Sequence, residues 1–226
     1  MTRDKIGHYI GGLPPLMLGD DREIDLEGHP YYLTDMALRT IITLPDPRLR
    51  QKSLPVAAID SGIEALIDDM LETMYAAPGI GLAAIQIAVP KRVLVIDVAK
   101  KEDENAAPDP QSFINPEILW ASEELSTYQE GCLSIPEFFE DIERPARIRV
   151  GYLDRAGRPQ EIEADGLLAT CLQHEIDHLD GVLFIDHLSR LKRARITRKF
   201  AKTKHKAPAG GPSKQSVGKE HAAADG

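Results

Sequence analysis

The sequence predicts an α+β fold in which antiparallel sheets pack around a central helix, with a further helix near the C-terminus. Two observations favour this class. Strand-like segments occur in blocks instead of alternating with helices, and apolar residues recur at helical spacing in two other segments. With 226 residues, 42% of them apolar and 28% charged, the chain has globular composition and room for one compact domain with tails.

Four segments can be assigned in the first three quarters of the domain. Residues 60–77 have apolar side chains at helical spacing, with Asp60 or Ser61 as the N-cap and Pro78-Gly79 as the end. Residues 92–98 (RVLVIDV) are continuously apolar and β-branched, which indicates a buried strand. Residues 146–154 and 159–165 surround Gly157 and predict an antiparallel hairpin.

The central helix is predicted over about residues 165–179 (DGLLATCLQHEIDHL), with Asp165 as its N-cap. Leu168, Leu172 and Ile176 make a second side of this helix apolar, so we expect it to be buried.

Several classes of protein are excluded. No run approaches the ~20 apolar residues that a transmembrane helix needs. Two cysteines cannot build a disulfide framework, and the N-terminus lacks the layout of a secretory signal. We therefore expect a reducing compartment, the bacterial cytoplasm, and no membrane partner.

The charge is unevenly distributed along the chain. The net charge is −9, yet residues 190–226 contain 11 Lys and Arg against 2 Asp and Glu. The acidic remainder does not favour nucleic acid, and we expect no DNA partner. Residues 187–206 predict a basic helix, with Leu188, Leu191, Ile196 and Phe200 as a thin apolar stripe against the body. Its cations either bind phosphate groups or form a solvated face without a partner.

The termini differ in composition from the domain. We interpret 1–35 as an N-terminal extension and Met36 as an alternative translation start, so that the extension is dispensable. The domain is expected over 36–207, and residues 208–226, which are small, polar and rich in Pro and Gly, are expected to be a disordered tail.

An HExxH motif, HEIDH (174–178), lies inside the predicted central helix. Residues four apart project from one face, so His174 and His178 can hold one metal ion. Glu175 is rotated from them by about 100°, where it can reach a water on the metal without being a ligand. The motif therefore predicts a metal site of three protein ligands, of which it supplies two.

The identity of the third metal ligand is open, with candidates on either side of the motif in the sequence. The downstream candidates are Asp180, Asp186 and His187, and the upstream candidate is Cys132 in EGCLS (130–134). A thiolate is a strong ligand for a borderline metal, and the preceding glycine allows a close approach of the backbone. Cys171 lies on the helix itself, where we interpret it as a small buried apolar residue.

The segment GIGLAAIQ (79–86) lacks the features of a nucleotide-binding loop. It has no Gly-Lys-Ser/Thr, and it follows a predicted helix rather than a strand. We interpret it as a small-residue strand along which an extended ligand can lie, with Gln86 offering an amide N–H.

Together, GIGLAAIQ, EGCLS and HEIDH resemble, in this order, the three signature motifs of peptide deformylases, and the resemblance extends from about Met36 to about Ala207. These enzymes are metal-dependent hydrolases that remove the formyl group from the N-terminal formyl-methionine of new polypeptides and release formate. The resemblance implies that Cys132, His174 and His178 bind one Fe2+ per chain, with Zn2+, Ni2+ or Co2+ as substitutes.

The resemblance also implies roles around the metal. Glu175 acts as general base and then general acid, and the Gln86 amide and the Leu133 N–H stabilise the oxyanion. The peptide pairs with the backbone around Ile80, Gly81 and Gly131. The resemblance also implies a pocket for the methionine side chain. Its six positions are Ile80, Tyr128, Leu167, Thr170, Cys171 and His174.

One departure and two alternatives accompany this interpretation. Where some members of the family have an arginine that orients the site, this chain has Phe139, which can offer apolar surface to substrate residues beyond methionine. An endopeptidase sharing HExxH is the first alternative, and it would not need Cys132. A ribosome-associated binding module is the second, and it would not need Glu175. We favour an enzyme whose 190–206 helix docks on ribosomal RNA.

Overall fold

The computed structural model describes residues 37–204, together with the short strands β1 (Glu23–Ile24) and β2 (Pro30–Tyr31), which pair antiparallel. The chain divides into two units, Met1–Met36 and Ala37–Gly226. The expected disordered tail, 208–226, and the rest of the expected extension, 1–35, lie outside the described residues.

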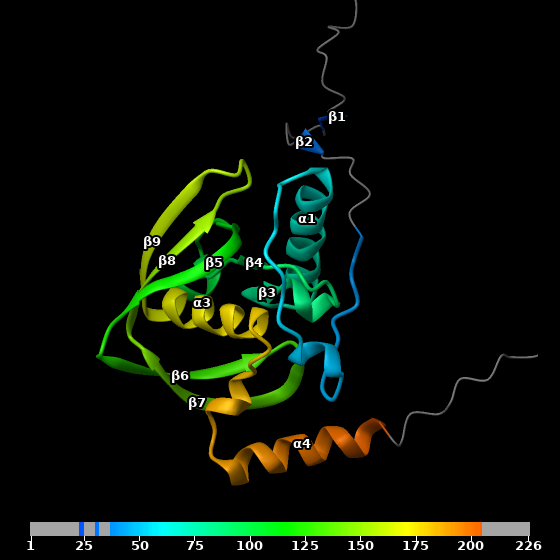
Figure 1. The fold of residues 1–226 in the computed structure, drawn as a ribbon, viewed down its shortest axis with the longest axis vertical. Helices are drawn as coiled ribbons and strands as arrows, with labels where there is room; N and C mark the ends of the chain where they lie inside the picture. Colours follow the sequence, from blue (N-terminus) through cyan, green and yellow to red (C-terminus); the bar gives the residue numbers. More distant parts are fainter. Residues whose placement is uncertain (1–22, 25–29, 32–36, 205–226) are drawn as a thin grey trace, which may run out of the picture. The chain divides into compact units, whose positions relative to one another are not determined.

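A five-stranded antiparallel sheet forms the main layer of the second unit, in the order β3-β4-β5-β8-β9 (Figure 1). The predicted strand at 92–98 is confirmed as a central strand, and the predicted hairpin at 146–165 is confirmed as the last two strands. The bounds are β3 (Gly81–Ala83), β4 (Val93–Ile96), β5 (Gln111–Ala121), β8 (Arg147–Leu153) and β9 (Pro159–Asp165).

A separate two-stranded hairpin consists of β6 (Leu125–Cys132) and β7 (Ile135–Pro145). It is inserted between β5 and β8, which are themselves neighbours in the five-stranded sheet. The tight turn at Leu133 and Ser134 therefore lies at the far end of an excursion from that sheet. The EGCLS segment forms the end of β6 and this turn.

The first helix, α1 (Ser61–Ala76), confirms the prediction at 60–77. Asp60 is the N-cap, and its carboxylate accepts a hydrogen bond of 2.9 Å from the Ile63 N–H. The buried face of α1, with Ile67 and Met70 fully buried, packs with β4 residues in one apolar cluster. The same cluster includes Leu82 of β3, so α1 packs against one side of this strand.

The central helix, α3 (Gly166–Leu179), lies between the five-stranded sheet and the hairpin (Figure 1). Leu172 and Leu179 are fully buried in a cluster with β4 and β8 residues. Asp165 occupies the predicted N-cap position, although its side chain accepts no capping hydrogen bond. The expected α+β fold, with antiparallel sheets around the HExxH helix, is confirmed.

The basic helix α4 (Arg190–Lys204) begins three residues later than predicted, because Phe184–His187 form a short 3-10 helix, η3. Ile196 is fully buried and Phe200 partly, but Leu191 is 83% exposed, so the expected stripe is wrong at that position. Five residues of helix rotate Leu191 by about 140° from Ile196, which places it on the outer side.

Three short helical segments complete the described part of the chain: η1 (Pro47–Arg50), η2 (Ala84–Ile87) and α2 (Ala99–Glu102). The segment 79–86 is thus a strand only at Gly81–Ala83, and Gln86 lies in the 3-10 turn that follows. Among the described helices, none combines the length and apolarity needed to span a membrane.

Candidate metal centre and substrate pocket

Helix α3 brings three polar side chains into the core. His174 and His178 are 7% and 1% exposed, and their ring centroids are 5.0 Å apart, as expected for residues one helical turn apart. Glu175, between them in sequence, is 4% exposed. Burial of three ionisable groups on one helix is costly unless other charges compensate them.

Cys132 approaches these residues from the end of β6. Its Sγ lies 3.2 Å from His178 Nε2, and one ligand atom each from Cys132, His174 and His178 lie within 4.8 Å of one another. One sulfur and two imidazole nitrogens are a donor set that suits a divalent transition-metal ion. The structure therefore contains a possible Cys-His-His metal site.

The downstream candidates make other contacts. Asp180 pairs with Arg92, and Asp186 pairs with Arg50. His187 is 2.8 Å from an Asp177 carboxylate oxygen. Among the residues that the structure describes, the group of Cys132, His174 and His178 is the only potential metal-binding cluster found.

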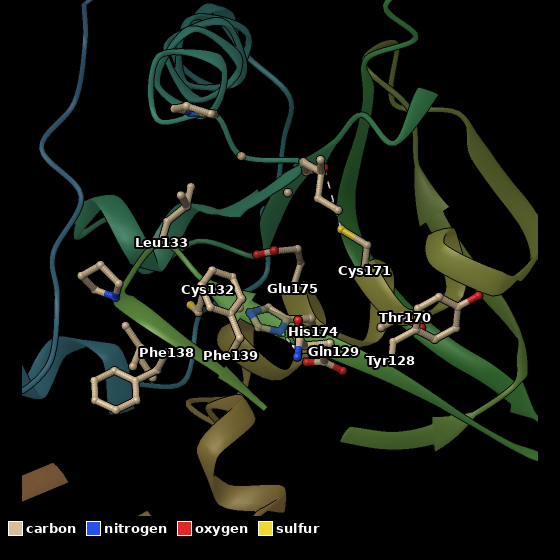
Figure 2. Close-up of a pocket in the computed structure, with 18 of the residues that line it drawn as sticks. Tyr128, Gln129, Cys132, Leu133, Phe138, Phe139, Thr170, Cys171, His174 and Glu175 are labelled. Atoms are coloured by element: carbon tan, nitrogen blue, oxygen red, sulfur yellow. Dashed lines mark hydrogen bonds and ion pairs between the residues drawn. The ribbon is translucent and has the colours of Figure 1, made fainter. Parts of the chain in front are cut away.

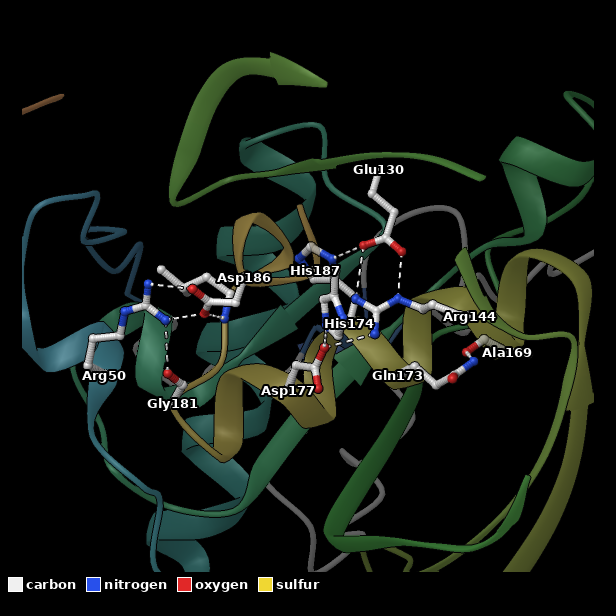
Figure 3. Close-up of polar contacts among 11 residues, drawn as sticks. Arg50, Glu130, Arg144, Ala169, Gln173, His174, Asp177, Gly181, Asp186 and His187 are labelled. Carbon is white, nitrogen blue, oxygen red and sulfur yellow. Dashed lines mark hydrogen bonds and ion pairs between the residues drawn. The ribbon is translucent and has the colours of Figure 1, made fainter. Parts of the chain in front are cut away.

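A buried carboxylate fixes the orientation of His174. The Glu130 carboxylate lies 2.8 Å from His174 Nδ1, which leaves Nε2 as the ring nitrogen for a metal (Figure 3). Burial lowers the pKa of the His174 imidazole, but the hydrogen bonds to Cys132 and Glu130 outweigh it and raise this pKa well above its ordinary value. The surroundings thus favour positive charge at the His174 ring.

Glu130 is itself held by Arg144, which also donates to Asp177 on α3 at 2.8 Å (Figure 3). Asp177 in turn contacts His187. Burial raises the pKa of both the Glu130 and the Asp177 carboxyl, but hydrogen bonds outweigh this effect, so both pKa values are lowered. The bonds to Glu130 come from His174 and Arg144. Those to Asp177 come from His187 and Arg144.

Sequence reasoning missed this network. One signal was available for Glu130: it lies two residues before Cys132 on a strand, so both side chains point to the same face, toward α3. Arg144 and His187 carry no such signal, because they reach the site from β7 and η3 through tertiary contacts alone.

The Glu175 carboxyl has a raised pKa and one unpartnered oxygen among the described residues. Burial raises the pKa of its carboxyl from 4.5 to about 7, with His174 opposing the shift. Its Oε2 is buried and has no hydrogen-bond partner among the described residues. Gly81 of β3 makes room for it, because a Cβ at position 81 would lie 2.6 Å from Glu175 Oε1 and 2.7 Å from Cys171 Sγ.

The other ring, that of His178, is kept neutral. Burial is the larger cause and the nearby His174 the second, and together they lower the pKa of His178 well below its ordinary value. A neutral imidazole is the form that binds a metal.

Gln86 and Leu133 lie beside the thiol. The Gln86 side-chain amide donates to Ser134 Oγ at 3.2 Å and lies 3.6 Å from Cys132 Sγ, while its oxygen accepts from the Ala83 N–H at 2.8 Å. Leu133 follows Cys132 in the β6–β7 turn. Both residues line the same cavity as Glu175.

That cavity, about 540 Å³, is lined by two of the three ligand candidates, Cys132 and His174 (Figure 2). Every residue expected in the methionine pocket lines it: Ile80, Tyr128, Leu167, Thr170, Cys171 and His174. The Thr170 hydroxyl donates to the Gly166 carbonyl at 3.1 Å, so its polarity is satisfied within the helix. Cys171 is buried, which raises the pKa of its thiol, so it fits the expected small apolar residue.

Two sheet edges border the cavity. β3 is the end strand of the five-stranded sheet, and among the strands that the structure describes β6 pairs only with β7. Gly81 of β3 and Gly131 of β6 both line the cavity. An extended peptide between these edges could pair with either backbone.

Comparisons with known proteins agree with this site. A family model described as polypeptide deformylase matches residues 38–194. A peptide deformylase from Methylocella silvestris is 72% identical over 167 residues, covering 74% of this chain and 85% of that protein. One from Rhodopseudomonas palustris is 62% identical over 167 residues, covering 74% and 95%.

Solved structures give the same result. The peptide deformylase from Ehrlichia chaffeensis in complex with actinonin is 45% identical, has a TM-score of 0.70, and is matched over 76% of this chain and all of that one. The peptide deformylase from Legionella pneumophila is 44% identical and has a TM-score of 0.68. The match covers 77% of this chain and 100% of that one. The chain belongs to the polypeptide deformylase family, whose members are metal-dependent hydrolases that remove the N-formyl group from newly synthesised polypeptides.

Proposed function

We propose that Cys132, His174 and His178 hold one Fe2+ ion per chain, which Zn2+, Ni2+ or Co2+ can replace, and that Glu175 is the acid–base residue of deformylation. The observation that supports this most is the convergence of one thiol and two imidazoles, from elements 42 residues apart, beside a buried carboxylate. When bound at three protein ligands, such an ion lowers the pKa of a water molecule and polarises a carbonyl.

The protein groups supply the rest of the reaction. Glu175 accepts the proton of the attacking water and passes it to the methionyl nitrogen as the formyl C–N bond breaks. Formate and a free amine result. The Gln86 amide and the Leu133 N–H donate to the oxygen that becomes negative when the water attacks.

The substrate binds between the two sheet edges. Its backbone pairs with residues around Ile80 and Gly81 on one side and Gly131 on the other. The methionine side chain enters the apolar part of the cavity, next to Leu167 and Cys171 of α3. This pose points the formyl group toward Cys132 and Glu175.

Formate release and metal content, measured on the same samples, test these assignments. Anaerobically purified protein should release formate from formyl-Met-Ala-Ser. Cys132→Ala should lose the metal, whereas Glu175→Gln should keep it and lose most activity. Asp180→Asn is the matched control, since an endopeptidase-type ligand set would use a downstream carboxylate. Metal retained by Cys132→Ala and lost from Asp180→Asn would contradict the proposed ligand set.

Iron is tested separately from the ligand set. A thiolate with Fe2+ is sensitive to oxidation, so aerobic purification or peroxide should inactivate the enzyme, and Ni2+ or Co2+ should restore it. Equal activity after aerobic and anaerobic purification, with iron lost from the aerobic sample, would exclude Fe2+ as the working ion.

Helix α4 docks the enzyme on ribosomal RNA in the cytoplasm, where nascent chains emerge. Several of its cations pair with the protein, such as Lys192 with Glu140 and Arg193 with Asp186. Arg190 and Arg198 are exposed and make no ion pair with any described residue, so they are available for phosphates. Arg190→Glu with Arg198→Glu should abolish cosedimentation with ribosomes at low salt, while Arg149→Glu on β8 should not. Undiminished cosedimentation of the double variant would refute this docking.

The catalytic domain is 36–207, and residues 1–35 are dispensable for deformylation. The family match that begins at residue 38 and the unit boundary after Met36 support this. Protein beginning at Met36 should deformylate with an unchanged kcat/KM. A loss of activity beyond a fewfold would contradict it.

A further inference from the structure

We propose that Phe139 makes this enzyme favour an apolar residue directly after the formyl-methionine. The inference rests on the proposed binding of the substrate along the edge of β6. It goes beyond that function because it concerns the second residue of the substrate, which neither the metal centre nor the methionine pocket contacts.

Phe139 is an exposed aromatic residue in the wall of the substrate cavity (Figure 2). Its side chain is on β7 and is 63% exposed. It pairs across the hairpin with Gly131 of β6. A Cβ at Gly131 would lie 2.5 Å and 2.7 Å from two carbons of the ring, so the ring lies directly over this glycine.

The alternation of side chains along β6 defines two faces of the hairpin. Tyr128, Glu130 and Cys132 point toward α3, whereas Gln129 and Gly131 point away from it. Phe139 shares the face of Gly131, because directly paired residues of an antiparallel pair lie on the same face.

A peptide added to the edge of β6 has the same alternation. If its methionine side chain points toward α3, the side chain of its second residue points to the face of Phe139. Position 131 lies between the two and has no side chain. The ring that covers this glycine is therefore an apolar side chain within reach of the second residue on that face.

Of the two acidic residues that lie two positions from Phe139 on β7, Glu137 lines the cavity and Asp141 does not. Glu137, two residues earlier on β7, is 80% exposed, and Lys199 of α4 lies 3.4 Å from its carboxylate. Since the two charges compensate each other, Glu137 offers the second residue little electrostatic attraction to compete with apolar contact with Phe139.

Paired tripeptides of equal size test the proposal. The probes are formyl-Met-Leu-Ser and formyl-Met-Asn-Ser, whose second side chains have the same number and branching of heavy atoms but differ in polarity. The parent protein should show a kcat/KM about fivefold to tenfold higher for the leucine peptide, the effect of covering about 50 Å² of apolar surface. In Phe139→Ala this ratio should fall to within twofold of one, and Phe139→Leu should restore part of it.

Leu125→Ala is the matched control. Leu125 is on the same hairpin, is 57% exposed, and does not line the cavity, so the ratio should stay at the parent value. Metal content is measured on every variant, so that a change in the ratio is not confused with loss of the ion.

Three results would overturn the proposal. One is a ratio near one in the parent protein while both peptides still release formate, which leaves the proposed function intact. Another is an unchanged ratio in Phe139→Ala. The third is a preference for formyl-Met-Lys-Ser over both probes that Glu137→Gln abolishes, which would assign selectivity to Glu137. Metal-loaded protein that releases no formate from any peptide would overturn this proposal and the proposed function together.

Discussion

Arg144 and Glu130 form a buried, bidentate ion pair. Arg144 Nε is 2.6 Å from Glu130 Oε1 and its second terminal nitrogen is 3.1 Å from Oε2, with the side chains 5% and 4% exposed. Through Asp177, the same guanidinium also joins the hairpin to α3. The hairpin provides Cys132 and the helix provides both histidines, so the contacts of Arg144 with Asp177 and of Glu130 with His174 connect the two elements of the candidate metal site.

Arg144→Leu should destabilise the protein by about 3–5 kcal/mol, because it removes the guanidinium from the buried carboxylate of Glu130 and the partly buried carboxylate of Asp177. Equilibrium urea unfolding of the metal-free proteins measures this. Arg147→Leu is the control, since Arg147 is 61% exposed and its pair with Glu124 contributes at most about 1 kcal/mol. Equal losses for the two variants would contradict the assigned role of Arg144.

Glu130→Gln should lower the affinity for Zn2+ by about 10- to 100-fold. The amide can accept a hydrogen bond from His174 but no longer makes the ligand more basic. Competition against a chromophoric chelator gives the affinity. Glu161→Gln, on the exposed surface of β9, should bind Zn2+ as the parent does. An affinity within twofold of the parent for Glu130→Gln would show that Glu130 does not support the ligand.

Gly81→Ala should lower kcat by roughly 10- to 100-fold while the metal content stays unchanged. The new methyl group would occupy the space of the Glu175 carboxylate and the Cys171 sulfur, so Glu175 must move from its position. Steady-state formate release with metal analysis measures both quantities. Gly62→Ala in α1, far from the cavity, should retain the parent kcat. Full activity in Gly81→Ala would mean that the position of Glu175 is not critical.

Glu175→Gln should stabilise the metal-free protein at high pH. The folded-state pKa of about 7 lies above the ordinary 4.5, so the folded protein holds this proton more tightly than the unfolded chain does. The contribution of Glu175 to stability therefore declines as pH rises from about 4.5 to about 7. The difference in unfolding free energy between variant and parent should grow from near zero at pH 4.5 to about 3 kcal/mol at pH 8. A difference independent of pH would contradict the raised pKa.

The helices were predictable because their signals are local. In α1 and α3, apolar spacing and flanking residues such as Asp60 suffice to define the element. Strand β5 was missed: its sequence, QSFINPEILWA, includes Pro116, and irregularities in its pairing with β8 interrupt the alternation of side chains. The β6–β7 hairpin was missed as well, since its pairing depends on a two-residue turn without Asn-Gly or Asp-Gly.

Of the candidate metal site, the two histidines were predictable from local sequence and the thiol was not. HExxH fixes the spacing of His174 and His178 within one helix, so their proximity follows from local structure. The approach of Cys132 does not, and only the resemblance to a family chose it over downstream residues. The need for glycine at position 81 also had no local signal, because the atoms it accommodates lie on α3.

The insertion of the hairpin between two neighbouring strands has a mechanical consequence. Because β5 and β8 are adjacent, β6 and β7 leave the sheet from a narrow base, and the thiol and Phe139 both lie well out from it. A tilt about this base would change the width of the cavity and the distance from the sulfur to the two imidazoles at once. A bulky molecule that widened the cavity would thereby move the thiol away from the two imidazoles without touching any of the three candidate ligands.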